Sequence, residues 1–260
     1  MSILDLLARS EHELGLTEIH QEVGVPKATA FMILNVLESH RMVKKNEQNR
    51  YTIGVRLYEL GVTYVSKLDL VKIGRPFISE LLRLTNLTSH LGALYDQRVI
   101  FIDKIEPKSM IRFSTFPGLR SDIHMCSLGK AMAAFLPDAE VDAIVAAVGL
   151  GAYTIHTITD AAALRTELAV VRERGFSIED EEGELGVRCI GAPIFDNSLR
   201  VVAAASVTGL LAAIPDTRYS ELGVEVTRIA DDITRALGGD PAEARRIHRL
   251  QSTPNPMGVA

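Results

Sequence analysis

The sequence contains no tryptophan, only 5% aromatic residues and two cysteines among its 260 residues. Two cysteines in a chain of this size argue against a disulfide-stapled secreted protein and favour the reducing cytoplasm, and they form neither a CxxC pair nor a zinc-ligand spacing. Neither sign of charge dominates, since 28 basic residues oppose 33 acidic ones. Charged residues at 23% and hydrophobic residues at 47% lie near the globular average, which excludes disordered and collagen-like chains.

Long hydrophobic runs are also missing. The uncharged apolar run at residues 201–214 includes Ser206, Thr208 and Gly209, and it falls well short of the roughly 20 residues that a membrane-spanning helix needs. The N-terminus lacks the basic start and the cleavage site of a signal peptide. The phosphate-binding Gly-x-x-x-x-Gly-Lys and the dinucleotide-binding G-x-G-x-x-G ahead of a helix are absent too. We therefore expect no membrane association and no cofactor.

Charge is distributed unevenly along the first part of the chain. Residues 1–23 carry one basic and five acidic side chains, whereas residues 24–56 carry six basic and two acidic ones. A compact basic segment in a protein with a net charge of −5 is typical of a nucleic-acid contact, although a solvated surface would show the same charge count. The arrangement of residues within the segment decides between a nucleic-acid contact and a solvated surface.

Three short helices are predicted at the N-terminus. The first ends near Glu13, the second runs over residues 17–22 and stops at Gly24, and the third begins at Pro26. Helical spacing turns one face of the third helix toward the core, with Ala30, Ile33, Leu34 and Leu37. Its outer face then carries Lys27, Ala28, Thr29, Phe31, Met32 and Asn35.

A basic hairpin follows the third helix. Two β-compatible runs, residues 42–45 and 50–53, flank a polar turn. Helix, turn, helix and hairpin form a winged helix-turn-helix, in which the last helix enters the DNA major groove and the wing contacts phosphate. The residues that we expect to contact DNA are Thr17, Lys27, Ala28, Thr29, Phe31, Met32, Asn35, Lys44, Lys45 and Arg50. Two alternatives remain open: a helical module without a nucleic-acid role, and a module whose Phe31 and Met32 contact a protein.

The rest of the chain has the pattern of an α+β domain with an antiparallel sheet. The predicted helices are 55–67, 70–84, one around 164–171 and one around 222–237, and the predicted strands are 88–96, 98–106, 110–116, 187–195 and 199–208. We therefore expect a DNA-binding domain (1–53), a linker helix (54–68), a second domain (69–239) and a C-terminal tail (240–260).

Several short motifs occur together along the chain. They are Leu16-Thr17-Glu18-Ile19, Val25-Pro26-Lys27-Ala28-Thr29, Tyr51-Thr52-Ile53-Gly54, His124–Ala131, Gly186–Ile190 and Ala192–Asp196. With these motifs the chain resembles the IclR family of bacterial transcriptional regulators, over about residues 1–239. The resemblance implies a winged helix-turn-helix followed by a GAF-like effector-binding domain. We expect a homodimer or homotetramer that binds a palindromic operator in double-stranded DNA and responds to a small organic acid.

Two positions of the expected recognition helix depart from the family pattern. Family members often carry Arg where this chain has Met32 and Ser where it has Ala28, so a guanidinium that could bind guanine bidentately is missing. We expect base contacts instead from Asn35 and Thr29. Apolar contacts with thymine methyl groups would come from Phe31 and Met32. The first helix is also a turn shorter than in the family, which suggests that translation starts upstream.

A ligand site is predicted in the second domain. Val187 and Cys189 share one strand face, and Ser206 and Thr208 share a face of the partner strand. Residues 127–130 open a helix whose free backbone N–H groups would hold a carboxylate. With the positions that match the family's effector pocket, the expected ligand residues are Met110, Phe113, Ser121, Ser127, Leu128, Gly129, Glu179, Val187, Cys189, Ser206 and Thr208. For the apolar ones among them, core packing is the alternative.

An enzyme is the alternative function. Ser127 and Lys130 match the S-x-x-K of acyl-transferring enzymes and hydrolases, but neither S-D-N nor K-T-G follows. The acidic run 179–184 is expected to form a solvated turn, apart from Glu179. The possible zinc ligands, whose spacing matches no zinc motif, are His124, Cys126, Glu179 and Cys189. We expect no metal and no catalytic residue.

Overall fold

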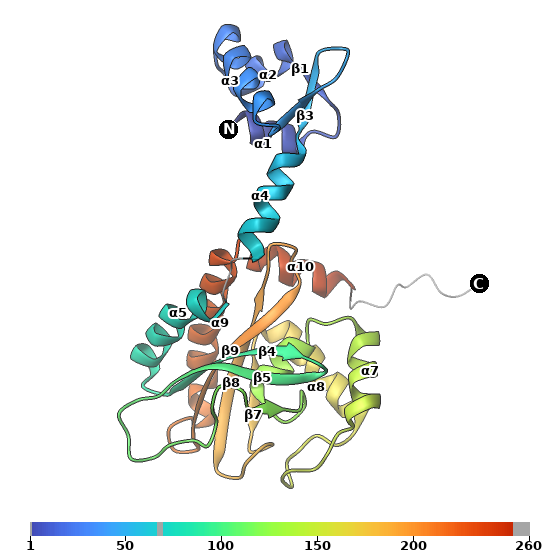
Figure 1. Cartoon of the computed structure of the whole chain (residues 1–260). Helices are drawn as coiled ribbons and strands as arrows, with labels where there is room; N and C mark the ends of the chain where they lie inside the picture. The colour runs from blue at the N-terminus through green and yellow to red at the C-terminus, as the bar shows by residue number, and fades with distance from the viewer. Residues whose placement is uncertain (1, 67–69, 252–260) are drawn as a thin grey trace, which may run out of the picture. The chain divides into compact units, whose positions relative to one another are not determined.

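The computed structural model describes residues 2–66 and 70–251 (Figure 1). The chain divides into two compact units, Met1–Leu68 and Asp69–Ala260. Each unit has its own hydrophobic core. Among the described residues, no helix combines the length and the apolar character that crossing a membrane requires.

The N-terminal unit is a winged helix-turn-helix. Its elements are α1 (Ile3–Arg9), β1 (Leu14–Gly15), α2 (Leu16–Val23), α3 (Lys27–Ser39), β2 (Val43–Lys45), β3 (Arg50–Ile53) and α4 (Val55–Ser66). Gly24 ends α2 in the left-handed conformation (φ 74°), and Pro26 occupies the N-cap position of α3. The hairpin of β2 and β3 forms the wing, and β1 pairs with the other edge of β3. The predicted second helix, third helix and hairpin are confirmed.

Two expectations for this unit are wrong. The first helix ends at Arg9, about a turn early, because residues 14–15 pair with β3 as a short strand. Ile33 is 41% exposed and not buried. The face of α3 that packs on α2 and β2 is the i, i+4 row of Ala30 and Leu34, which are fully buried, and Ile33 lies off that row.

The C-terminal unit is an α+β domain built on a six-stranded antiparallel sheet, which confirms the predicted fold class. The strand order is β6-β5-β4-β9-β8-β7. The strands are β4 (Thr88–Tyr95), β5 (Arg98–Ile105), β6 (Arg120–Ser121), β7 (Ser177–Asp180), β8 (Val187–Phe195) and β9 (Val201–Leu210). The helices are α5 (Leu70–Thr85), α6 (Ser127–Ala133), α7 (Asp138–Val148), α8 (Ala161–Arg174), the 3-10 helix η1 (Asp216–Arg218), α9 (Tyr219–Ala236) and α10 (Pro241–Gln251).

Helices cover both faces of this sheet. On β4, Leu91 contacts α5 at Gly74, whereas the next residue, Gly92, lies against Leu128 of α6. Helices α5 and α9 pack on the first face (Figure 1). Helix α6, with α8 against it, packs on the second face. Gly191 of β8 permits the close approach of α6, since a Cβ atom there would lie 2.9 Å from the backbone of the first α6 residue. The start of α6 is therefore held against the β8–β9 hairpin.

Residues 110–116 form a loop and not the predicted strand. The strand that pairs with β5 at this edge is the two-residue β6. Side chains hold the loop: Lys104 Nζ donates to the carbonyl oxygens of Phe113 (2.8 Å) and Thr115 (3.0 Å), and the Thr115 hydroxyl lies 2.8 Å from His90 Nε2. Because an ammonium group satisfies these carbonyls, the loop needs no partner strand there.

Candidate DNA interface and ligand cavity

A cavity of about 470 Å³ lies in the C-terminal unit, between the start of α6, strands β7, β8 and β9, and two loops. The sheet register assembles its floor, because Cys189 pairs with Thr208 across β8 and β9 and with Glu179 across β7 and β8. Most of the predicted ligand residues line the cavity: Phe113, Ser121, Ser127, Leu128, Glu179, Val187, Cys189, Ser206 and Thr208. Met110 and Gly129 are not among the lining residues.

The cavity wall also contains loop residues that we did not predict. They include Ile111, Arg112, Thr115, Met125, Glu184 and Leu185. In the structure these residues lie in loops, and three of them belong to the segment 110–116 that we predicted as a strand, so only their nearness in the chain to predicted ligand residues could have indicated them. Met110 is fully exposed, because its segment is the loop described above and not a strand.

Gly129 is a packing residue of α6. A Cβ atom at this position would lie 2.4 Å from the carbonyl oxygen of Ile123, so only glycine allows the two backbones to approach. The Gly129 N–H donates to Cys126 Sγ at 3.4 Å. The Gly129 N–H is therefore engaged within the chain, contrary to our expectation for this residue.

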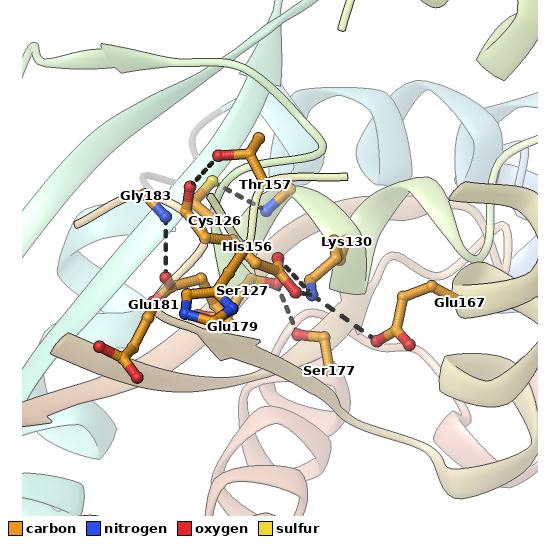
Figure 2. A network of polar contacts seen from close by, with 12 residues as sticks. Cys126, Ser127, Lys130, His156, Thr157, Glu167, Ser177, Glu179, Glu181 and Gly183 are labelled. Carbon is orange, nitrogen blue, oxygen red and sulfur yellow. Dashed lines mark hydrogen bonds and ion pairs between the residues drawn. The ribbon is translucent and has the colours of Figure 1, made fainter. Parts of the chain in front are cut away.

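The cavity floor is acidic and holds two neutral thiols. Glu179 is buried and accepts a hydrogen bond from the Gly183 backbone N–H at 3.0 Å (Figure 2), and burial raises the pKa of its carboxyl group. Burial also raises the pKa of Cys126 to about 11 and the pKa of Cys189 well above its ordinary value. The Thr208 hydroxyl donates to Cys189 Sγ at 3.2 Å. At neutral pH both cysteines are thus polar lining groups and not nucleophiles.

Lys130, on α6, is completely buried among carboxylates (Figure 2). Its Nζ lies 2.6 Å from Glu182 and 3.7 Å from Glu167 of α8. Glu182 belongs to the acidic run that we expected to be solvated, and for this buried residue the expectation is wrong. Burial raises the pKa of Glu182 to about 7. The pairing engages the amine that an S-x-x-K enzyme would use as a base.

Within residues 2–66 and 70–251, no group of three or more His, Cys, Asp or Glu side chains is arranged to hold a metal ion. His124, one of the possible zinc ligands, has its Nε2 atom 2.9 Å from the carbonyl oxygen of Gly151. Its ring packs against Tyr153, with 6.0 Å between the ring centres. His124 is thus a buried core residue whose Nε2 atom has a partner and whose Nδ1 atom has none in the described part of the chain.

His90 makes the stability of the C-terminal unit depend on pH. Burial, together with the nearby Lys104 charge, lowers its pKa from 6.5 to about 3. As the pH falls below the pKa of the unfolded chain, the unfolded chain binds a proton that the folded state does not, so stability is lost. We expect the free energy of unfolding to fall by about 2 kcal/mol from about pH 7 to pH 5 through this residue.

Urea unfolding at a series of pH values measures this loss. His90→Gln serves as the matched variant, because glutamine can donate and accept hydrogen bonds without titrating in this range. The difference between the two proteins isolates the contribution of His90 from that of the other titrating groups. Equal pH dependence in both would contradict the prediction.

In the N-terminal unit, most of the predicted DNA contacts lie at the surface of α2, α3 and the wing. The exposed ones are Thr17, Lys27, Ala28, Thr29, Phe31, Met32, Asn35 and Lys44. Lys27 Nζ donates to Thr17 Oγ1 at 3.0 Å and so joins the starts of α2 and α3. Ile33 and Val36, which were not predicted, extend the exposed apolar surface of α3.

Besides Thr17 and Lys27, two more of the predicted DNA contacts interact with other residues of the N-terminal unit. Arg50 Nε donates to the carbonyl oxygen of Glu13 (2.8 Å), and its Nη2 pairs with Glu18 (3.1 Å). Lys45 Nζ lies 5.7 Å from the centre of the Tyr51 ring. Arg50 therefore ties the wing to α2 and to the segment before it.

Two family models match the two units. The model of the IclR helix-turn-helix domain matches residues 1–47, and the model of the bacterial transcriptional regulator IclR C-terminal domain matches residues 62–235. The chain belongs to the IclR family. As an IclR-family protein with this helix-turn-helix, it is a transcriptional regulator that binds DNA.

Relatives and solved structures agree with this assignment. The regulator XynR of Escherichia coli (strain K12) is 32% identical over 92% of this chain and 95% of its own length. The transcriptional repressor IclR of the same organism is 31% identical over 92% of this chain and 88% of its own. The Thermotoga maritima IclR structure, 28% identical, covers 91% of this chain and 96% of its own with a TM-score of 0.64. These relatives are named as regulators and repressors, and not as enzymes.

A structure with lower sequence identity shares the fold. The Agrobacterium tumefaciens repressor BlcR, 24% identical, superimposes with a TM-score of 0.80 and covers 91% of this chain and 93% of its own.

Proposed function

We propose that this IclR-family regulator is a homodimer or homotetramer whose winged helices bind the half-sites of a palindromic operator, under the control of a small organic acid. The observation that carries the proposal is the cavity, because a volume of about 470 Å³ suits a small molecule. Symmetry accounts for the palindrome, since equivalent winged helices meet equivalent half-sites. Residues 1–53 would bind DNA, 54–68 would link, 69–239 would bind the effector, and 240–260 would form a tail.

The side chains of the cavity favour a ligand with an apolar body. Phe113, Leu128 and Val187 supply apolar walls, and Ser206 and Thr208 supply hydroxyl groups. A ring or an alkyl chain would contact the former, and oxygen-bearing groups the latter. This combination is typical of specific small-molecule sites.

The carboxylate of such a ligand is best placed toward Arg112. Among the described residues that line the cavity, Arg112 is the only basic one; its side chain is 76% exposed, and its Nε lies 3.4 Å from a Glu106 carboxylate oxygen, which leaves the two Nη groups for contacts with a ligand. The buried floor carries the acidic Glu179, which would disfavour a second carboxylate beside it.

The ligand can change DNA occupancy only through different affinities for DNA-competent and DNA-incompetent arrangements of the regulator.

Fluorescence anisotropy with the full chain tests the DNA part of the proposal. We expect tighter binding to the duplex immediately upstream of the protein's own coding region than to a scrambled duplex, and affinity that falls steeply with salt. Lys44→Ala should lower the slope of log affinity against log salt by about 0.9 per bound protomer, through the loss of one phosphate contact. Lys108→Ala, at an exposed lysine of the C-terminal unit, should leave the slope unchanged.

Organic acids added to the bound complex test the ligand part. We expect an acid with an aromatic or alkyl body to shift the anisotropy curve, and Thr208→Val to weaken that shift while DNA binding stays intact. DNA binding without a response to any such acid would contradict control by an organic acid. No binding to either duplex at low salt would contradict the regulator's proposed operator.

A further inference from the structure

The exposed face of α3 has a composition that selects one kind of base readout. We infer that this regulator recognises A·T base pairs in the major groove through the methyl groups of thymine, which Phe31 and Met32 contact, and not guanine through arginine. The inference rests on the proposed operator binding by α3 and adds the chemical feature that the helix reads.

The solvent-facing side chains of α3 are largely apolar. Met32 is 68% exposed, Val36 58% and Phe31 43%. The opposite row of the helix, Ala30 and Leu34, forms part of the core of the N-terminal unit. Helix stability therefore does not explain the outer residues, and clustered exposed apolar side chains of this kind mark a binding surface.

The same helix offers no side chain for bidentate recognition of guanine. It contains no arginine, and its one lysine, Lys27, is its first residue and is bonded to Thr17 Oγ1 at 3.0 Å. Arg50 of the wing is held by the carbonyl oxygen of Glu13 and by the carboxylate of Glu18. Guanine is read chiefly by a guanidinium or ammonium on its O6 and N7 atoms.

Thymine and adenine present what this face can contact. The C5 methyl of thymine is an apolar group in the major groove, and phenyl and thioether side chains pack against it. Asn35 lies one turn beyond Met32 and is exposed. Asparagine binds N6 and N7 of adenine through two hydrogen bonds. Methyl contacts with one base and amide contacts with its partner together identify an A·T pair.

The surroundings of the face favour DNA over a protein as its occupant. Residues 24–56 carry six basic and two acidic side chains in a protein with a net charge of −5. Lys44, on the wing, is exposed. The IclR helix-turn-helix match over residues 1–47 includes the whole of α3. A protein partner remains an outcome that the experiment below distinguishes.

Replacing thymine by uracil removes the methyl group and leaves base pairing unchanged. We compare binding of the full chain to the upstream duplex synthesised with thymidine and with deoxyuridine nucleotides. A buried methyl group is worth about a fourfold change in affinity. One such contact in each of two half-sites predicts a loss of about 16-fold, and two in each half-site predict a loss of about 250-fold.

The double variant Phe31→Ala/Met32→Ala tests the residues. Both side chains are exposed, so the fold should be retained, as circular dichroism will show. We expect this variant to bind the two duplexes with nearly equal affinity and to keep the salt dependence of the wild type. Ile155→Ala, at an 87% exposed apolar residue of the C-terminal unit, should discriminate between the duplexes as the wild type does.

Each other outcome decides against the inference in a different way. Equal binding of both duplexes by the wild type would overturn the inference and leave operator binding intact, with the apolar face free for a protein. Discrimination that persists in the double variant would overturn the assignment to Phe31 and Met32. Failure to bind the thymine duplex at low salt would contradict the proposed operator binding and, with it, the inference.

Discussion

Replacing Lys130 by methionine is expected to lower the free energy of unfolding of the C-terminal unit by about 3–5 kcal/mol. The Lys130 side chain is fully buried, and its Nζ lies 2.6 Å from Glu182 and 3.7 Å from Glu167. Methionine has a similar length but no charge, so the variant leaves two carboxylates without their shared ammonium group in a poorly solvated site. Urea unfolding followed by circular dichroism measures the loss.

A double variant separates lost charge pairing from lost packing. Lys130→Met/Glu182→Gln removes both main partners, and we expect it to be more stable than Lys130→Met alone, because the uncompensated carboxylate is gone. Lys108→Met, at an exposed lysine, should change stability by less than about 0.5 kcal/mol. A similarly small effect of Lys130→Met would show that the buried ion pair contributes little.

Gly129→Ala is expected to destabilise the C-terminal unit by about 3 kcal/mol, because the new methyl group meets backbone and not a movable side chain. The added Cβ would lie 2.4 Å from the carbonyl oxygen of Ile123 and 2.6 Å from its Cα. To remove this close contact, α6 would have to move away from the segment before it. Because Ser127 and Leu128 of α6 line the cavity, ligand response should weaken together with stability. Thermal unfolding and the anisotropy titration measure the two effects.

Gly151→Ala is the matched control for this variant. A Cβ there would meet only the Tyr153 ring, at 3.9 Å, which is ordinary contact, so we expect stability close to that of the wild type. If Gly129→Ala kept wild-type stability and lost the ligand response alone, Gly129 would be a ligand residue, as the sequence indicated, and not a packing residue.

The N-terminal unit was largely predictable because its signals are local. Gly24 and Pro26 separate α2 from α3, and strand-compatible runs flank the turn of the wing. The failures there have long-range causes. Helix α1 ends early because residues 14–15 pair with β3, and Ile33 is exposed because α2 and β2 cover only the neighbouring row of α3. The spacing of apolar residues within a helix does not indicate which other helices and strands will cover it.

The cavity was predictable in its strands and not in its loops. Alternation groups Val187 with Cys189 along β8 and Ser206 with Thr208 along β9, because residue spacing in a strand determines the face, and all four residues line the cavity. The loop that carries Met110, Ile111 and Arg112 has no such rule, and its path follows from hydrogen bonds that Lys104 donates to its carbonyl groups. The family resemblance supplied Glu179 and Ser121, which periodicity alone would not have indicated.

By itself, then, the amino-acid sequence determined the helix-turn-helix with its wing, the two hairpins of the larger sheet and the place of Phe31 and Met32 on the outer face of α3, since each depends on residues close together in the chain. Only the tertiary structure decided that Glu182 is a buried partner of Lys130, which lies 52 residues away, and that Gly129 is required for packing against Ile123. The reason is physical: burial and charge pairing depend on distant segments meeting in space, and such meetings leave no repeat in the sequence of either segment.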